Sequence, residues 1–177
     1  MRHLSTYLAL LIVAAYLPAA GQNLVLNPSF EDFPGCPQGP SEFSSTTNWQ
    51  DPFENFIGDT CSTSDIYSSC APFGAFGVGV PDNILGSQAA HTGNSYAGII
   101  LYEGFTAFGC TSLFGSDWRE YAEGQLSSPL SAGQEYCVSF WVSLADNVKW
   151  STDDIGVYFS NSLVNISCGT VGNSVLP

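Results

Sequence analysis

Residues 135–146, EYCVSFWVSLAD, decide the fold class that the sequence predicts. Large apolar side chains alternate here with mostly small or polar ones: Tyr136, Val138, Phe140, Val142 and Leu144 alternate with Cys137, Ser139, Trp141, Ser143 and Ala145. A period of two is typical of a β-strand with one buried face. We therefore expect the first set to face a core and Trp141 to stand out from the opposite face.

Strand-like stretches recur elsewhere, separated by turn residues. Residues 33–83 are rich in Gly, Pro, Ser and Thr and predict a long loop region, in which short strands around Trp49 and Tyr67 are an option. No stretch after residue 21 has helical periodicity, so the sequence predicts an all-β fold, an antiparallel β-sandwich. Pro28 and Pro129 close two of the strands because proline cannot donate a ladder hydrogen bond. The further strands are expected at 23–27, 96–101, 119–130 and 155–160, the last with Ile155, Val157 and Phe159 inward.

The first 21 residues have the pattern of a secretory signal peptide. Arg2 and His3 precede an apolar run of about 12 residues, shorter than the roughly 20 that a membrane-spanning helix needs. Small residues end the leader, and we place cleavage after Gly21. Residues 22–177 are then expected to form a single exported module of a secreted, cell-surface or outer-membrane protein.

The charge of the exported part excludes some partners. It keeps all 16 acidic residues but only two cations, Arg119 and Lys149. Phosphate backbones and anionic lipids are bound through Lys and Arg, so we expect neither nucleic acid nor a lipid surface as a partner.

The cysteines predict disulfides. An even number in an exported chain favours bridges, and no C-x-x-C motif points to zinc or redox chemistry. Six cysteines allow 15 pairings, and their spacing does not choose among them. A bridge such as Cys36 to Cys70 would stabilise the fold by roughly 3–4 kcal/mol. The six are Cys36, Cys61, Cys70, Cys110, Cys137 and Cys168.

An ordered series of motifs resembles a known family. It comprises NLVLNPSFED (23–32), GCP (35–37), Trp49, SDIYSSC (64–70), GVPDNILGSQAAHTGNSYAGI (79–99), the stretch 118–146 and DDIGVYFS (153–160). Together they are similar to the N-terminal galactose-binding-like module, related to carbohydrate-binding modules, of Bacteroidetes-type exported surface proteins. Such proteins often continue into OmpA-type or gliding and sorting domains.

The resemblance implies a jelly-roll sandwich without catalysis. In the family, further strands follow the 155–160 strand, so the module is expected to be incomplete at its C-terminus. Any membrane contact would then come through a missing C-terminal anchor domain. Modules of this kind often hold a structural calcium through the acid of N-x-x-F-E and a loop before a later strand. Glu31, Thr92 and Asn94 match those positions, and calcium takes about 6–8 oxygen ligands.

Exposed aromatic rings are the candidate ligand-binding residues, because sugars stack on them while polar groups bind the hydroxyls. Arg119 could bind a ligand carboxylate, although a structural ion pair is the common fate of such a residue. The alternative for each ring is burial under a loop or a second sheet. The candidates are Trp49, Tyr67, Trp118, Trp141 and Tyr158.

Catalytic constellations are missing from the sequence. The GNSYA stretch superficially resembles a nucleophile elbow at Ser95, but such a site needs a His later in the chain, and His91 precedes it. Glu120 and Glu123 have the wrong spacing for one face of a strand. We expect a non-catalytic surface binding or adhesion module with a glycan as its ligand. The alternative is a structural spacer or display domain, and a glycoside hydrolase is the least favoured.

Overall fold

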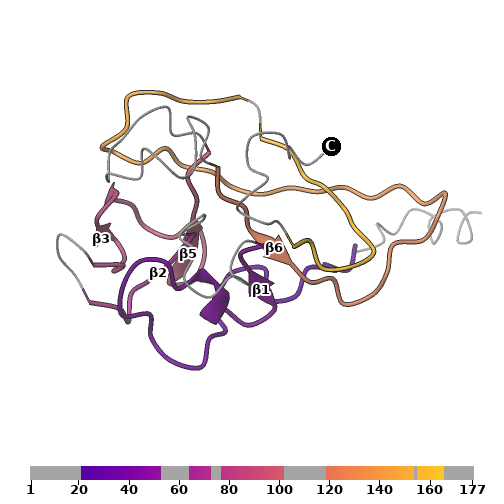
Figure 1. Ribbon diagram of the computed structural model, residues 1–177, viewed down its shortest axis with the longest axis horizontal. Helices are drawn as coiled ribbons and strands as arrows, with labels where there is room; N and C mark the ends of the chain where they lie inside the picture. Colours follow the sequence, from indigo (N-terminus) through magenta and orange to yellow (C-terminus); the bar gives the residue numbers. More distant parts are fainter. Residues whose placement is uncertain (1–20, 53–63, 73–76, 102–118, 154, 166–177) are drawn as a thin grey trace, which may run out of the picture.

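The computed structural model describes residues 21–52, 64–72, 77–101, 119–153 and 155–165. These parts contain one short 3-10 helix and six short strands (Figure 1). No helix among them is long and apolar enough to cross a bilayer. The elements are η1 (Phe43–Ser45), β1 (Trp49–Gln50), β2 (Asp65–Ser68), β3 (Asp82–Asn83), β4 (Gly86–Ser87), β5 (Ser95–Gly98) and β6 (Glu123–Gly124).

The strands pair in three antiparallel couples: β1 with β6, β2 with β5, and β3 with β4. The β2–β5 couple is the longest, with four residue pairs running from Asp65 opposite Gly98 to Ser68 opposite Ser95. A bridge between Val25 and Leu126 lies outside these couples. The all-β class is therefore confirmed for the described residues, and β5 confirms the first part of the strand expected at 96–101.

The main core lies on the β2–β5 couple. Tyr67 of β2 is fully buried and stacks on Tyr96 of β5, with ring centroids 5.2 Å apart. Gly98 lets the Tyr67 ring lie across its strand, because a Cβ at position 98 would fall 2.5 Å from Tyr67 Cε2. The core cluster consists of Tyr67, Ala71, Val78 and Val80, with Ile84, Leu85, Ala90 and Tyr96 packed against it.

The NPSFED corner folds around Asn27, which has a left-handed φ of 47° that Asn tolerates. Its side-chain amide donates to the carbonyls of Asp32 and Thr47, and its Oδ1 accepts the Asp32 N–H. The corner presents Phe30 to Phe43 and Trp49, with centroids 6.2 and 4.7 Å away. This first corner therefore holds a second, smaller aromatic cluster together.

One disulfide, between Cys36 and Cys70, joins the long loop region to the end of β2, with Cα atoms 5.8 Å apart. It is the pairing that the sequence left as one option among several. Closing a loop of this length stabilises a fold by about 3–4 kcal/mol in the chain-entropy model. Cys137 is exposed and unpaired within the described part of the chain. Cys61, Cys110 and Cys168 lie outside the described residues.

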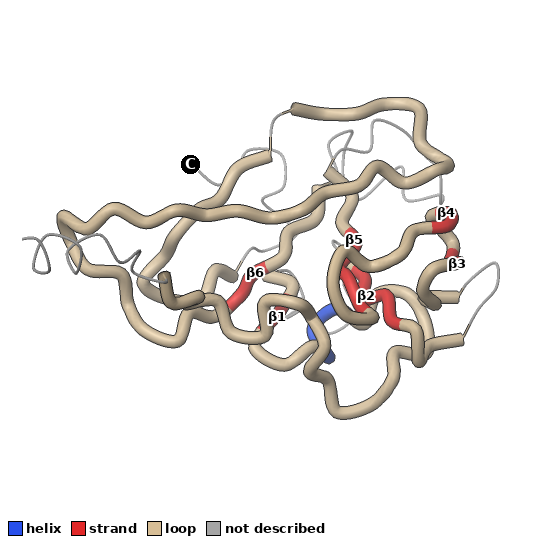
Figure 2. Tube along the Cα trace, turned by 180° about the vertical axis from the view of Figure 1, so that it is seen from behind, coloured by secondary structure: helices blue, strands red, loops and turns tan. Residues whose placement is uncertain are grey.

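The strands expected at 136–145 and 155–160 are not formed. The chain after β6 runs back toward β3–β4 as irregular backbone on the outside of the molecule (Figures 1 and 2). The side chains expected to face a core are exposed, with 52% of Phe140 and 67% of Val142 accessible. The reason is that a strand needs a neighbour for its ladder. Within the described residues, the main chain of 137–144 makes no hydrogen bonds.

Gly98→Ala is expected to lower the free energy of unfolding by about 1–3 kcal/mol, because the added Cβ meets a fully buried, stacked Tyr67 ring. Urea unfolding of the oxidised protein measures the change. Gly156→Ala is the matched control, since a Cβ there meets nothing within 4 Å. Equal stability of the two variants would contradict the close packing of Gly98 on Tyr67.

Candidate functional site

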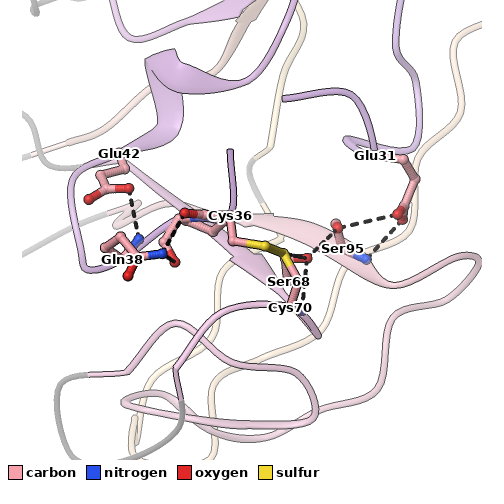
Figure 3. Close-up of a disulfide and its surroundings, with 8 residues drawn as sticks. Glu31, Cys36, Gln38, Glu42, Ser68, Cys70 and Ser95 are labelled. Carbon is pink, nitrogen blue, oxygen red and sulfur yellow. Dashed lines mark hydrogen bonds between the residues drawn. A yellow bond between two sulfur atoms is a disulfide. The ribbon is translucent and has the colours of Figure 1, made fainter. Parts of the chain in front are cut away.

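The Glu31 carboxylate ties the first corner to the turn that precedes β5. Its Oε1 accepts the backbone N–H groups of Asn94 at 2.7 Å and Ser95 at 2.9 Å (Figure 3). Gly93 sits in this turn with a φ of 70°, and a Cβ there would overlap Glu31 Oε1. Two hydrogen bonds to one ionised oxygen are of the strong, charge-assisted kind. Glu31 therefore fixes the position of the 91–95 turn.

A chain of polar contacts continues from Glu31 to the disulfide. The Ser95 hydroxyl lies 3.4 Å from Glu31 Oε2 and 3.1 Å from Ser68 Oγ, which in turn lies 3.4 Å from Cys70 Sγ (Figure 3). Ser68 and Ser95 are direct partners in the β2–β5 register. The contacts join the corner, both core strands and the bridge in one unit, so Ser95 has a structural role here.

The residues expected to hold calcium belong to this arrangement. Glu31 and the 92–94 turn do lie together, but Oε1 already accepts two amide hydrogens. In the described parts of the chain, no three His, Cys, Asp or Glu residues are grouped to hold a metal. Calcium binding by Glu31, Thr92 and Asn94 stays a prediction.

A second feature is an aromatic stack on the surface. The rings of His91 and Trp141 are parallel within 15°, with centroids 4.0 Å apart. Trp141 is 78% exposed, so the indole face turned away from His91 is open to solvent. Beside it, Ser143 Oγ donates to Gln88 Oε1 at 2.7 Å. We call Gln88, His91, Trp141 and Ser143 the His91–Trp141 platform.

Both sides of the platform are held in place. On the 88–91 side, Gln88 donates its N–H to the Pro81 carbonyl at 2.7 Å, and Glu31 holds the turn that follows His91. On the other side, Asp146 binds the β3–β4 turn through two hydrogen bonds. Its Oδ2 accepts the Ser87 N–H at 2.8 Å, and its own N–H donates to Leu85 O at 2.9 Å. The platform is therefore anchored at each end.

The other predicted ligand residues are scattered. Tyr67 is in the core, and Trp49 is half-buried, donating its Nε1–H to Asn27 O at 2.9 Å, so neither ring is open for stacking. Tyr158 is 49% exposed and is not part of the platform. Arg119 is exposed and already takes part in an interaction within the molecule. Trp118 lies outside the described residues.

Two acids of the chain, Glu120 and Glu123, are engaged in hydrogen bonds. Glu120 is almost fully buried, and its Oε2 accepts the Ile100 N–H at 2.8 Å. Glu123 accepts hydrogen bonds from Gln50 Nε2 and from the Val164 N–H. Each carboxylate is committed to holding backbone or side chain in place, which argues against an acid–base role for the pair.

Asp65 and Tyr67 form the most strongly perturbed pair. Burial raises the pKa of Asp65, and hydrogen bonds from the Ser41 N–H at 2.7 Å and the Tyr67 hydroxyl at 2.8 Å partly oppose this rise. Burial, and then the neighbouring Asp65 carboxylate, raise the pKa of Tyr67 well above its ordinary value. Tyr67 therefore stays protonated and acts as a hydrogen-bond donor inside the core.

Of the platform residues, sequence reasoning singled out only Trp141 as a ligand contact. His91, Gln88 and Ser143 were missed in that role, because a stack across 50 residues of sequence leaves no local signal. The outward position of Trp141 in the alternating stretch was the usable clue.

Comparison with known proteins adds no relative to this picture: no family model matches the chain, and neither the curated proteins nor the solved structures contain a significant match.

Tyr67→Phe is expected to cost about 1–2 kcal/mol of stability at pH 7, because Asp65 Oδ2 loses its buried donor. The folded pKa of Asp65 lies above its unfolded value. Its stabilising contribution is therefore complete below about pH 4 and is lost as the pH rises through the folded pKa. Removing the Tyr67 donor raises the folded pKa of Asp65 further. The difference in free energy of unfolding between wild type and variant should therefore grow between about pH 4 and pH 7.

Urea unfolding at the two pH values tests this. In an Asp65→Asn background the cost of Tyr67→Phe should no longer depend on pH. A cost that is the same at both pH values with Asp65 present would contradict the coupling.

Proposed function

We propose that this chain is a non-catalytic binding module of an exported surface protein, and that it binds a glycan on the His91–Trp141 platform. The observation that carries the proposal is the Trp141 indole, which has one face stacked on His91 and the other face open. Pyranose rings pack their C–H faces on such surfaces, because the face of an aromatic ring is electron-rich.

Polar groups beside the indole would bind sugar hydroxyls. Gln88 offers an amide and Ser143 a hydroxyl, already joined to each other by a hydrogen bond that fixes their positions. A few fixed polar groups around an apolar surface are the usual composition of a small-ligand site. The excess of acidic residues in the chain would repel an anionic polysaccharide, so a neutral glycan is the ligand class we propose.

The setting of the module belongs to the same proposal. We infer a galactose-binding-like jelly-roll sandwich, exported through the leader at 1–21 and acting at the cell surface or outer membrane, within a longer protein of the OmpA-type or sorting class. The motif series supports this inference, as do the short antiparallel strands. The Cys36–Cys70 bridge supports an oxidising compartment outside the cytoplasm.

Glycan-array binding of the oxidised protein, followed by titration of a neutral oligosaccharide that it binds, tests the proposal. Trp141→Ala should weaken binding about tenfold or more, since it removes the stacking surface. His91→Ala should weaken binding less, because it removes the support of the indole and leaves the ring.

Trp150→Ala is the matched control, since Trp150 is 87% exposed but lies outside the platform. It should bind as the wild type does. Equal loss in Trp150→Ala and Trp141→Ala would contradict the platform as the site. No binding to any glycan would favour the structural spacer instead.

A further inference from the structure

The stretch 137–145 lies on the surface as irregular backbone with the sequence pattern of a strand. The sequence alternates as a strand does, yet the main chain of 137–144 makes no hydrogen bonds within the described residues. The apolar side chains of one face are about half exposed or more: Val138, Phe140, Val142 and Leu144. An unpaired strand with an apolar face is a template for pairing with another chain.

The order of side chains in this stretch is symmetric about Trp141. Residues at equal distances on either side are alike in kind: Phe140 and Val142, Ser139 and Ser143, Val138 and Leu144, Cys137 and Ala145. An antiparallel copy centred on Trp141 would therefore set large apolar residues against large apolar ones, and hydroxyls against hydroxyls. Such directly opposed pairs are the units that stabilise a sheet.

The charges around the stretch fit the same register. No charged residue lies between 137 and 145, so the pairing places no like charges directly against each other within the stretch. Centring on Trp141 places Glu135 opposite Asn147, and Tyr136 opposite Asp146, so no two acids face each other. The other exposed apolar stretch, 155–163, lacks this symmetry, because Val157 would face Asn161.

We propose that residues 137–145 pair antiparallel with the same residues of a second copy of this chain, with the two-fold axis at Trp141. The interface is isologous, since every contact occurs twice: Ser139 of each copy faces Ser143 of the other, and only Trp141 faces itself. It uses the backbone edge and the alternating apolar side chains of the stretch, and it rests on the symmetry of the sequence and not on glycan binding. A contact of this size belongs to the weak, small class of interfaces.

Cysteine cross-linking of the full chain tests the register. In a Cys137→Ser background, which removes the exposed thiol, Trp141→Cys should form a disulfide-linked dimer under mild oxidation, because residue 141 faces itself. The yield of dimer should be at least about fivefold lower for Ser139→Cys alone or Ser143→Cys alone, because neither residue faces itself. A mixture of the two variants should cross-link readily, because residues 139 and 143 are directly opposed in this register. The Cys137→Ser chain alone measures the background from Cys61, Cys110 and Cys168, and Trp141→Cys should exceed that background clearly.

Sedimentation velocity gives an independent reading. The wild type should shift from monomer to dimer over the micromolar range, and Val142→Lys should abolish the shift by placing a charge opposite Phe140. Leu163→Lys, at an equally exposed apolar site outside the stretch, should leave it unchanged. A monomer at every concentration up to about 500 μM, or Ser139→Cys cross-linking as well as Trp141→Cys, would overturn the proposal.

Discussion

The pairing of β2 with β5, fastened at one end, is the constraint on which the rest of the structure depends. Ser68 and Ser95 are opposite each other in this couple. Glu31 binds the turn entering β5, and the Cys36–Cys70 bridge holds the turn leaving β2. The first corner, the long loop and both core strands are therefore joined at a single point. With strands only four residues long, such a junction supplies stability that a larger core would give in other folds.

The hydrogen bonds of Glu31 also position the surface site. The turn that Glu31 holds begins just after His91, so His91 is presented from a fixed backbone. Asp146 fixes the other side by holding the β3–β4 turn, and Trp141 reaches His91 from that side. An aromatic platform held at both ends is a preorganised surface, which loses little conformational freedom when a ligand binds.

The sequence predicts those features of the fold that rest on local chemistry. The strand at Tyr96–Gly98, the proximity of Glu31 to the 92–94 turn and the option of a Cys36–Cys70 bridge follow from short motifs or from the family resemblance. Tyr67 lies in the core and is not an exposed ring, and SDIYSSC could not show this, because Ile66 and Tyr67 are adjacent and give no alternation that assigns a face. His91 escaped notice because its partner is 50 residues away. At 136–145 the sequence predicts a strand that the structure does not form. Its alternation specifies a face to bury, but alternation does not supply the strand that must lie beside it.

Native-state hydrogen exchange, followed residue by residue at low protein concentration, tests the central role of the fastened couple most directly. The slowest amides should be those of Ile66–Ser68 and Ser95–Gly98, together with the Asn94 amide that Glu31 binds. The amides of 138–144 should exchange nearly as fast as in an unfolded peptide. Two results would contradict the β2–β5 couple as the structural centre. One is fast exchange of the amides throughout β2 and β5, and the other is protection of the 138–144 amides in the monomer equal to that of the β2 and β5 amides.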